Sequence, residues 1–173
     1  MHTLTVRAAR ETDLPALTDI YNYYIRESPA TFDIVPATPE NRREWFHHYS
    51  QTGPHRLLVA VRGDEVAGYA SSSVFRPKPA YLTSVETSIY VHPDRRGRQV
   101  GSLLYTELFR ALAGEDLHRA YAGVTLPNDA SVALHRKFGF QEVGVYREVG
   151  RKFGQYWSVA WFEKALPHRP PQT

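Results

Sequence analysis

The chain of 173 residues contains no cysteine, which excludes disulfides, thiolate metal ligands and a cysteine nucleophile. Long apolar runs are also missing, so the sequence offers neither a membrane-spanning helix nor the core of a signal peptide. We therefore expect a cytoplasmic protein without a membrane partner. The eight histidines are scattered, with no pair at helical spacing beside a carboxylate, and we expect no metal site.

The chain also lacks a strong net charge of either sign. The 21 lysines and arginines nearly balance the 18 aspartates and glutamates, and the basic residues form short groups such as Arg42–Arg43. Short groups favour a small anionic ligand over nucleic acid, which is bound by an extended basic surface. Because the length suits one hydrophobic core, we predict a single domain over residues 1–166 and a proline-containing tail over 167–173.

Helices and strands are predicted to alternate along the chain. Apolar residues at helical spacing indicate a first helix beginning at Thr12–Asp13 and a second that begins at Thr38 and contains Tyr49. A third helix follows Gly101, and a fourth covers residues 129–138. Apolar, β-branched runs predict strands over residues 4–8, 56–61, 65–75, 84–91, 119–124, 141–146 and 156–162. This order predicts an α/β domain built around one sheet.

The stretch from His92 to Gly101 is a basic, glycine-bearing loop between a predicted strand and a predicted helix. Free backbone N–H groups and the macrodipole at the start of a helix favour an anion. Gly97 and Gly101 let a ligand approach the backbone, and arginines at positions 95, 96 and 98 add charge-assisted hydrogen bonds. The stretch predicts a phosphate-binding loop unlike the dinucleotide and Walker motifs, with a plain surface loop of solvated arginines as the alternative.

Residues Arg96–Gly101 resemble the pyrophosphate-binding signature of the GNAT superfamily of N-acetyltransferases, written Q/R-x-x-G-x-G/A. Gln99 stands where the middle glycine is usual, which leaves open whether CoA binding is weakened. A second stretch, Leu126–His135 followed by Phe138–Phe140, resembles the asparagine-bearing helix of the same superfamily and its closing Gly-Phe. The resemblance implies acetyl-CoA as co-substrate.

Within that superfamily the sequence is similar to acetyltransferases of phosphinothricin and of methionine sulfoximine or sulfone, from about residue 4 to residue 165. The residues that carry this likeness are Tyr21–Asn22, Thr31–Phe32, Val85–Glu86, Ile89–Val91, Leu126–Asp129 and His135. The likeness implies an α/β (α+β) fold, with a mixed, strongly twisted sheet splayed at its middle, helices on both faces, and a homodimer. It also implies acetyl transfer to the α-amine of a small anionic amino-acid analogue.

Two residues are candidates for catalysis. An α-amine with a pKa of about 8 is mostly protonated at neutral pH, so a base is needed before it attacks. Glu86 lies in the middle of a predicted strand and matches the acidic residue assigned that role in the family; a solvated strand face is the alternative. His135 stands where many relatives carry a tyrosine thought to protonate the departing thiolate, and a packing role is the alternative. Which of the two is the base stays open, and no nucleophilic triad is visible, which favours direct attack.

The remaining site residues follow from the resemblance. Arg76 and Lys78 match basic positions that bind the anionic substrate, although they could be solvated surface residues. Phe32 and Tyr81 are expected to wall the substrate pocket, although aromatics more often belong to the core. The residues expected to bind the cofactor are Ile89, Val91, Arg96, Gly97, Arg98, Gln99, Val100, Gly101, Ser102, Asn128 and Ser131.

Three alternatives remain at this point. The acceptor could be another amine, such as a polyamine or a peptide N-terminus. The substitution of glycine by Gln99 raises the alternative of a non-catalytic acyl-CoA-binding module. A nucleic-acid-binding module is the third, and it would show steeply salt-dependent binding.

Overall fold

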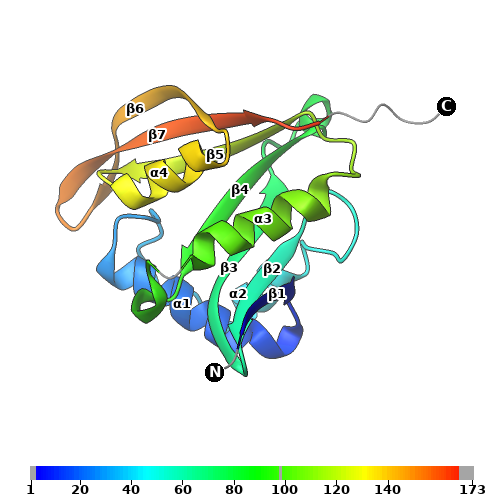
Figure 1. Cartoon of the computed structure of the whole chain (residues 1–173). Coiled ribbons are helices and arrows are strands. Elements are labelled where there is room, and N and C mark those ends of the chain that lie inside the picture. The colour runs from blue at the N-terminus through cyan, green and yellow to red at the C-terminus, as the bar shows by residue number, and fades with distance from the viewer. Residues whose placement is uncertain (1–2, 98, 168–173) are drawn as a thin grey trace.

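A computed structural model describes residues 3–97 and 99–167, so most of the predicted tail lies outside the described residues. It shows one seven-stranded sheet in the order β1-β2-β3-β4-β5-β7-β6 (Figure 1). The strands are β1 Leu4–Ala8, β2 Leu57–Arg62, β3 Glu65–Val74, β4 Ser84–Val91, β5 Arg119–Leu126, β6 Gln141–Lys152 and β7 Gln155–Ala165. The helices are α1 Leu14–Glu27, α2 Pro39–Phe46, α3 Val100–Leu112 and α4 Asp129–Lys137.

Helices cover both faces of the twisted sheet because the buried strands are apolar on both sides (Figure 1). Along β2, Leu58 and Ala60 pack into one core with α3 and α4, whereas Leu57, Val59 and Val61 pack into a second core with α1 and α2. This alternation follows from the two-residue period of a strand. The predicted fold class and the placement of helices on both faces are confirmed.

The sheet opens between β4 and β5. These are parallel neighbours, and their register covers only Ser84↔Arg119, Val85↔Ala120 and Glu86↔Tyr121. Beyond these pairs, β5 continues to pair with β7 as far as Leu126, while β4 continues to pair with β3 as far as Val91. The predicted splay at the middle of the sheet is therefore confirmed.

Some predicted boundaries were wrong. The second helix ends at Phe46, so Tyr49 lies outside it. The last two strands are longer than 141–146 and 156–162, because backbone pairing with β7 continues past a bulge after Tyr146 even though most of β6 is exposed. An exposed edge strand does not need alternating apolar residues, so its full length leaves a weak sequence pattern.

No helix in the described part of the chain is long and apolar enough to cross a membrane. Among the same residues, no group of three or more histidine, aspartate or glutamate side chains is placed to hold a metal ion.

The backbones of β3 and β4 approach each other closely at Gly68. A Cβ there would lie 2.7 Å from the Tyr90 carbonyl oxygen and 3.1 Å from Val91 Cα. We expect Gly68→Ala to lower the free energy of unfolding by about 1–3 kcal/mol, because backbone atoms must shift. The control is Gly114→Ala, whose Cβ meets nothing within 4 Å and should change the free energy by less than about 0.5 kcal/mol. Urea unfolding measures both, and equal stabilities would contradict the close approach.

Candidate active site

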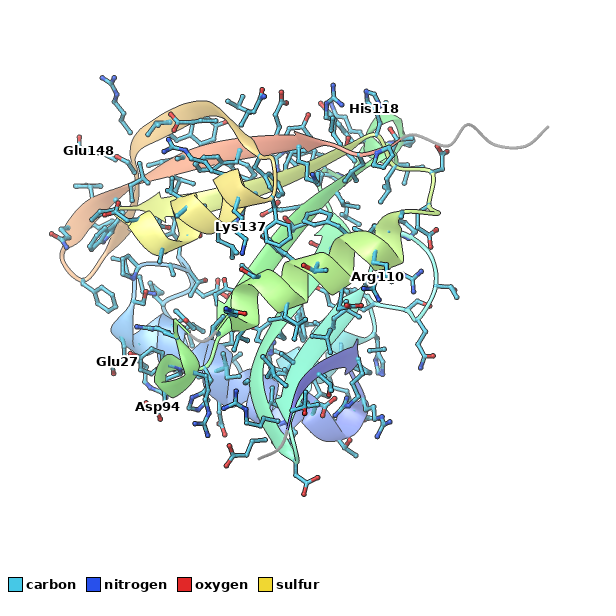
Figure 2. The ribbon with its side chains drawn as sticks, viewed as in Figure 1. Glu27, Asp94, Arg110, His118, Lys137 and Glu148 are labelled. Atoms are coloured by element: carbon cyan, nitrogen blue, oxygen red, sulfur yellow. The ribbon has the colours of Figure 1, made fainter. Side chains whose placement is uncertain are left out.

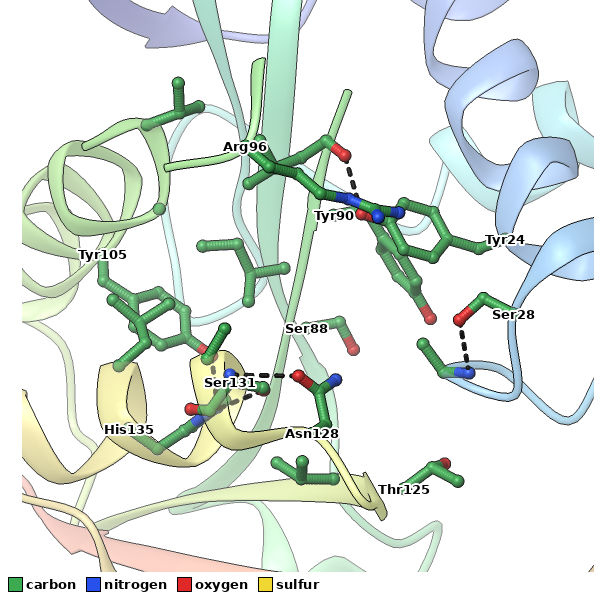
Figure 3. Close-up of a pocket in the computed structure, with 18 of the residues that line it drawn as sticks. Tyr24, Ser28, Ser88, Tyr90, Arg96, Tyr105, Thr125, Asn128, Ser131 and His135 are labelled. Carbon is green, nitrogen blue, oxygen red and sulfur yellow. Dashed lines mark hydrogen bonds between the residues drawn. The ribbon is translucent and has the colours of Figure 1, made fainter. Parts of the chain in front are cut away.

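The splay between β4 and β5 contains a cavity of about 660 Å³. Its lining comes from β4 (residues 87–91), β5 (residues 123–125), the end of α1, the start of α3 and α4. In Figure 3, Tyr24, Tyr90 and Arg96 lie on one side of this cavity, and Tyr105 and His135 lie on the other. The facing edges of β4 and β5 beyond their last register pair are therefore part of a cavity wall rather than of a continuous sheet.

One end of the cavity is built for an anion. The Leu103 N–H donates to the Gln99 carbonyl at 3.0 Å, so the preceding N–H groups of Val100, Gly101 and Ser102 have no acceptor within the helix. These three residues line the cavity, and the positive end of the α3 macrodipole coincides with them.

Gln99 has the left-handed backbone conformation, with φ of 61°. This conformation costs a non-glycine residue about 1–2 kcal/mol, which explains physically why glycine is usual at this position. Gly101 has a further role, because a Cβ there would lie 3.1 Å from Leu134 Cδ2, so the small residue lets α3 and α4 approach each other.

The arginines of the loop have different environments. Arg96 lines the cavity, and its guanidinium lies 5.5 and 5.4 Å from the ring centroids of Tyr23 and Tyr24. Arg95 also lines the cavity, but its guanidinium is engaged in an ion pair of 2.6 Å with Glu65, the first residue of β3. Arg96 is thus the better placed of the two for an anionic ligand.

Sequence reasoning missed one cation at this end. Lys137, the last residue of α4, lies between α4 and α3 (Figure 2), and its Nζ donates to Ser102 Oγ at 2.9 Å. The basic pair that contains Lys137 was visible in the sequence, but nothing in the pattern indicated that α4 ends beside the start of α3. Arg98, the remaining arginine of the predicted loop, lies outside the described residues.

Asn128 both caps a helix and lines the cavity. Its Oδ1 accepts a hydrogen bond from the Ser131 N–H at 3.1 Å, which caps α4, and both residues line the cavity. Ten of the eleven predicted cofactor residues therefore surround one cavity, the exception being the undescribed Arg98.

His135 is buried and belongs to a hydrogen-bonded chain in the cavity wall. Its Nδ1 lies 2.7 Å from the Ser131 carbonyl oxygen and must donate to it, so Nε2 accepts from the Tyr105 hydroxyl at 2.8 Å. Burial lowers the pKa of His135, and the bond to the Ser131 carbonyl only partly offsets this, so a neutral imidazole is favoured. The Tyr105 hydroxyl also lies 3.4 Å from Thr87 Oγ1 on β4.

Tyr105 lines the cavity but was not predicted as a site residue. It lies in the buried stripe of α3 beside Leu104 and Leu108, so its sequence position indicated only packing. Burial raises the pKa of Tyr105 well above its ordinary value, which keeps the hydroxyl protonated.

Glu86 is the last residue of β4 that pairs with β5. Its neighbours Val85 and Thr87 point toward α3, so alternation directs Glu86 to the face covered by α1 and α2. Burial raises the pKa of Glu86, while the nearby positive charge of Arg76 lowers it and leaves a net rise. This carboxyl group is therefore a stronger base than an exposed glutamate.

A second cavity of about 290 Å³ lies on the α1 and α2 face of the sheet. Side chains of α1, α2, β3 and β4 line it, and Ser88 and Tyr90 of β4 line both cavities. Glu86 itself lines neither cavity, but Ser88, which lines both, is two residues after it on the same face of the strand.

The four predicted substrate residues line neither of these cavities. Arg76 is exposed on the connection from β3 to β4, with its guanidinium 4.5 Å from the Phe75 ring centroid. Lys78 and Tyr81 are exposed on the same connection, and the rings of Tyr81 and Phe75 lie 5.9 Å apart. Of these residues, Arg76 has the clearest link to the site, through its electrostatic effect on Glu86.

Phe32 comes from the connection between α1 and α2. Its ring lies so close to Gly150 of β6 that a Cβ at that glycine would collide with it. The contact fixes the α1–α2 connection against the β6–β7 hairpin. Phe32 therefore lies against the β6–β7 hairpin, whereas Arg76, Lys78 and Tyr81 lie on the connection from β3 to β4.

Comparison with known proteins accounts for this arrangement. The model of the Acetyltransferase (GNAT) family matches residues 17–140. A phosphinothricin N-acetyltransferase of Streptomyces coelicolor is 60% identical over 163 residues, which are 93% of this chain and 95% of that protein. An L-methionine sulfoximine/L-methionine sulfone acetyltransferase of Pseudomonas paraeruginosa is 33% identical over 94% of each chain.

A comparison with solved structures agrees with these sequence similarities. The crystal structure of a GNAT superfamily phosphinothricin acetyltransferase from Sinorhizobium meliloti, in complex with acetyl-CoA, has a TM-score of 0.91 at 29% identity, covering 99% of this chain and 92% of that one. The resemblance predicted from the sequence motifs is thereby confirmed. Matches of this extent in sequence and in fold show that the chain belongs to the acetyltransferase (GNAT) family.

Proposed function

We propose that this acetyltransferase moves the acetyl group of acetyl-CoA to the α-amine of a small anionic amino-acid analogue such as phosphinothricin, methionine sulfoximine or methionine sulfone. The observation that carries the proposal is the 60% identity to a phosphinothricin N-acetyltransferase over nearly the full length of both chains. The two cavities share Ser88 and Tyr90 on the strand that contains Glu86, which supports the proposal because a donor and an acceptor must approach each other at one point.

The larger cavity suits acetyl-CoA. The free N–H groups at the start of α3, with Arg96 and Lys137 nearby, would hold the pyrophosphate. Backbone groups of β4 beyond Glu86 face the cavity without a β5 partner, and they would bind the amide-containing arm. When bound, acetyl-CoA supplies the activated acetyl thioester.

The proposed acid–base roles follow from burial and hydrogen bonding. Glu86 takes a proton from the acceptor ammonium, directly or through water, because its raised pKa makes the carboxylate a better base. The Tyr105 hydroxyl lines the cavity and donates to the neutral His135, which orients it. To supply its one proton to the departing thiolate, this hydroxyl turns from His135 Nε2 toward the sulfur. The amine attacks directly, without an acyl-enzyme.

We also propose a homodimer. The edge strand β6 has no neighbour on its outer side in the described sheet, and the β6–β7 hairpin has several large apolar side chains that are 38–61% exposed: Val143, Val145, Tyr146, Val149, Phe153 and Tyr156. Exposed apolar edges of this kind are typical of interfaces.

The dimer is tested by sedimentation velocity of the native chain and of Val145→Lys. We expect a dimer for the native chain and a shift toward monomer for the variant, since a charge at the interface must be desolvated. Val35→Lys, on the exposed α1–α2 connection, is the control and should stay dimeric. A native monomer would contradict the proposal.

The reaction is tested by CoA-thiol release from acetyl-CoA with L-phosphinothricin, methionine sulfoximine, methionine sulfone, polyamines and peptides. We expect turnover confined to the anionic amino acids, and a loss of about 100- to 10,000-fold in kcat for Glu86→Gln, which removes the base. Glu107→Gln is the control, because this glutamate pairs with Arg110 within α3.

Either of two results would contradict the proposed reaction. Turnover of polyamines or peptides in place of the amino acids would indicate another acceptor. A lack of turnover with every acceptor in the panel, together with intact CoA binding, would indicate a non-catalytic acyl-CoA-binding module.

We also propose that the enzyme is cytoplasmic, since acetyl-CoA is a cytoplasmic metabolite. Cell fractionation would test this location.

The left-handed conformation of Gln99 predicts a specific effect on CoA binding. Gln99→Gly removes a Cβ beside the anion-binding turn and fits the backbone, so we expect the Kd for CoA to fall several-fold. Gln99→Ala keeps both the Cβ and the unfavourable φ, and should bind CoA like the native chain. Titration calorimetry measures all three; equal affinity of the glycine and alanine variants would show that the Cβ does not limit binding.

A further inference from the structure

Arg42 of α2 is a buried cation without a counter-ion. It is 5% exposed, and its Nε and Nη2 atoms have neither solvent contact nor a hydrogen-bond partner. No ion pair of the described residues includes it, whereas its neighbour Arg43 pairs with Glu11 at 3.5 Å. The desolvation cost of this buried charge is not offset by a negative partner in the described part of the chain.

Aromatic rings hold this guanidinium. Its Cζ lies 3.5 Å from the ring centroid of Trp45 and 4.8 Å from that of Tyr21. Contacts of this kind stabilise the face of the guanidinium, while its N–H groups point outward in the plane. The arrangement fixes the orientation of Arg42 and leaves in-plane donors without acceptors.

Arg42 lines the smaller cavity, the one that meets the acetyl-CoA cavity at Ser88. Hydroxyl groups of Ser71 and Ser73 on β3 and of Ser88 on β4 belong to the same lining. A cavity of about 290 Å³ with a fixed cation and several hydroxyl groups has the size and polarity for one small amino acid.

The one carboxylate in that lining is engaged elsewhere. Asp33 Oδ2 accepts a hydrogen bond of 2.6 Å from the Tyr21 hydroxyl, and Tyr21 contacts Thr31 Oγ1 at 3.0 Å. Burial raises the pKa of Tyr21 to about 12, so this hydroxyl stays protonated and continues to donate. No ion pair within 4.0 Å joins Asp33 to Arg42 among the described residues, so Asp33 does not supply the missing partner.

We propose that Arg42 binds the α-carboxylate of the acceptor amino acid and is a determinant of acceptor specificity. The inference rests on the proposed function and assigns the acceptor to the smaller cavity, with its carboxylate toward α2 and its amine toward Ser88 and Glu86. A planar guanidinium matches a carboxylate in two parallel hydrogen bonds. Because Nε and Nη2 are enclosed in the structure, the proposal requires a shift of the Arg42 side chain that opens these donors to the cavity. Arg76 and Lys78, which are exposed, are left to act on the side chain of the acceptor or on its approach.

The experiment compares L-methionine sulfone with its α-carboxamide as acceptors, because the carboxamide lacks the charge that Arg42 is proposed to bind. The carboxamide also has an α-amine of lower pKa, so the preference of each variant is compared with that of the native chain at one pH, where this difference is common to all of them. We expect the native chain to prefer the carboxylate in kcat/KM by about 10- to 100-fold, the range for a hydrogen-bonded charge. In Arg42→Gln the preference should fall to near unity, mainly through KM, and Arg42→Lys should be intermediate because it keeps the charge but not the paired donors.

The control is Arg43→Gln, an exposed position with the same chemical change, which should keep the native preference. Binding of CoA by Arg42→Gln, measured by calorimetry, should equal that of the native chain, since Arg42 does not line the larger cavity. If Arg42→Gln does not fold, the test uses Arg42→Lys. A carboxylate preference of Arg42→Lys as large as that of the native chain then overturns the inference.

An unchanged preference in Arg42→Gln, with both acceptors slowed equally, would also overturn it, because a purely structural cation would affect the two acceptors alike. Failure of the proposed function looks different. In that case the native chain itself would not acetylate methionine sulfone or the other anionic amino acids.

Discussion

Only three register pairs join the parallel strands β4 and β5, and the organisation of the site depends on their separation. A strand whose edge loses its partner has backbone groups that need other acceptors and donors. Here those groups face a cavity of about 660 Å³, at one end of which α3 begins with free N–H groups. The same strand has Glu86 on its other face at the last paired position, so one structural feature positions both the donor site and the candidate base.

Burial then sets the chemistry of the side chains around this opening. Desolvation raises the pKa of Glu86 and lowers that of His135, so at neutral pH the first is a strengthened base and the second a neutral hydrogen-bond acceptor. The protonated group beside this imidazole is the Tyr105 hydroxyl, which is hydrogen-bonded to His135 Nε2. The proposed base, a carboxyl group, and the proposed acid, a phenol, thus lie on either side of β4.

The donor site could be predicted from the sequence because its residues are close together in the chain: the Arg96–Gly101 signature and the helix after Asn128 each form one wall. The proposed acceptor side could not, because Arg42, Ser71 and Ser88 come from three separate elements and no local pattern joins them. Arg42 in the sequence is half of an ordinary basic pair, and only the packing of α2 against Tyr21 and the sheet shows that it is buried while its neighbour is exposed. The sequence shows that Gln99 departs from the glycine of the family signature, but it does not show that the φ of Gln99 is left-handed.

Hydrogen exchange of the native chain with and without acetyl-CoA tests the central role of the splay most directly. The amides of β4 between Thr87 and Val91 that point away from β3, and those of Val100, Gly101 and Ser102 at the start of α3, should gain protection, because these groups lack acceptors until the ligand binds. The β6–β7 hairpin, which does not line the cavity, should change little. Protection in that hairpin or in α2, with none in β4 and α3, would contradict the account.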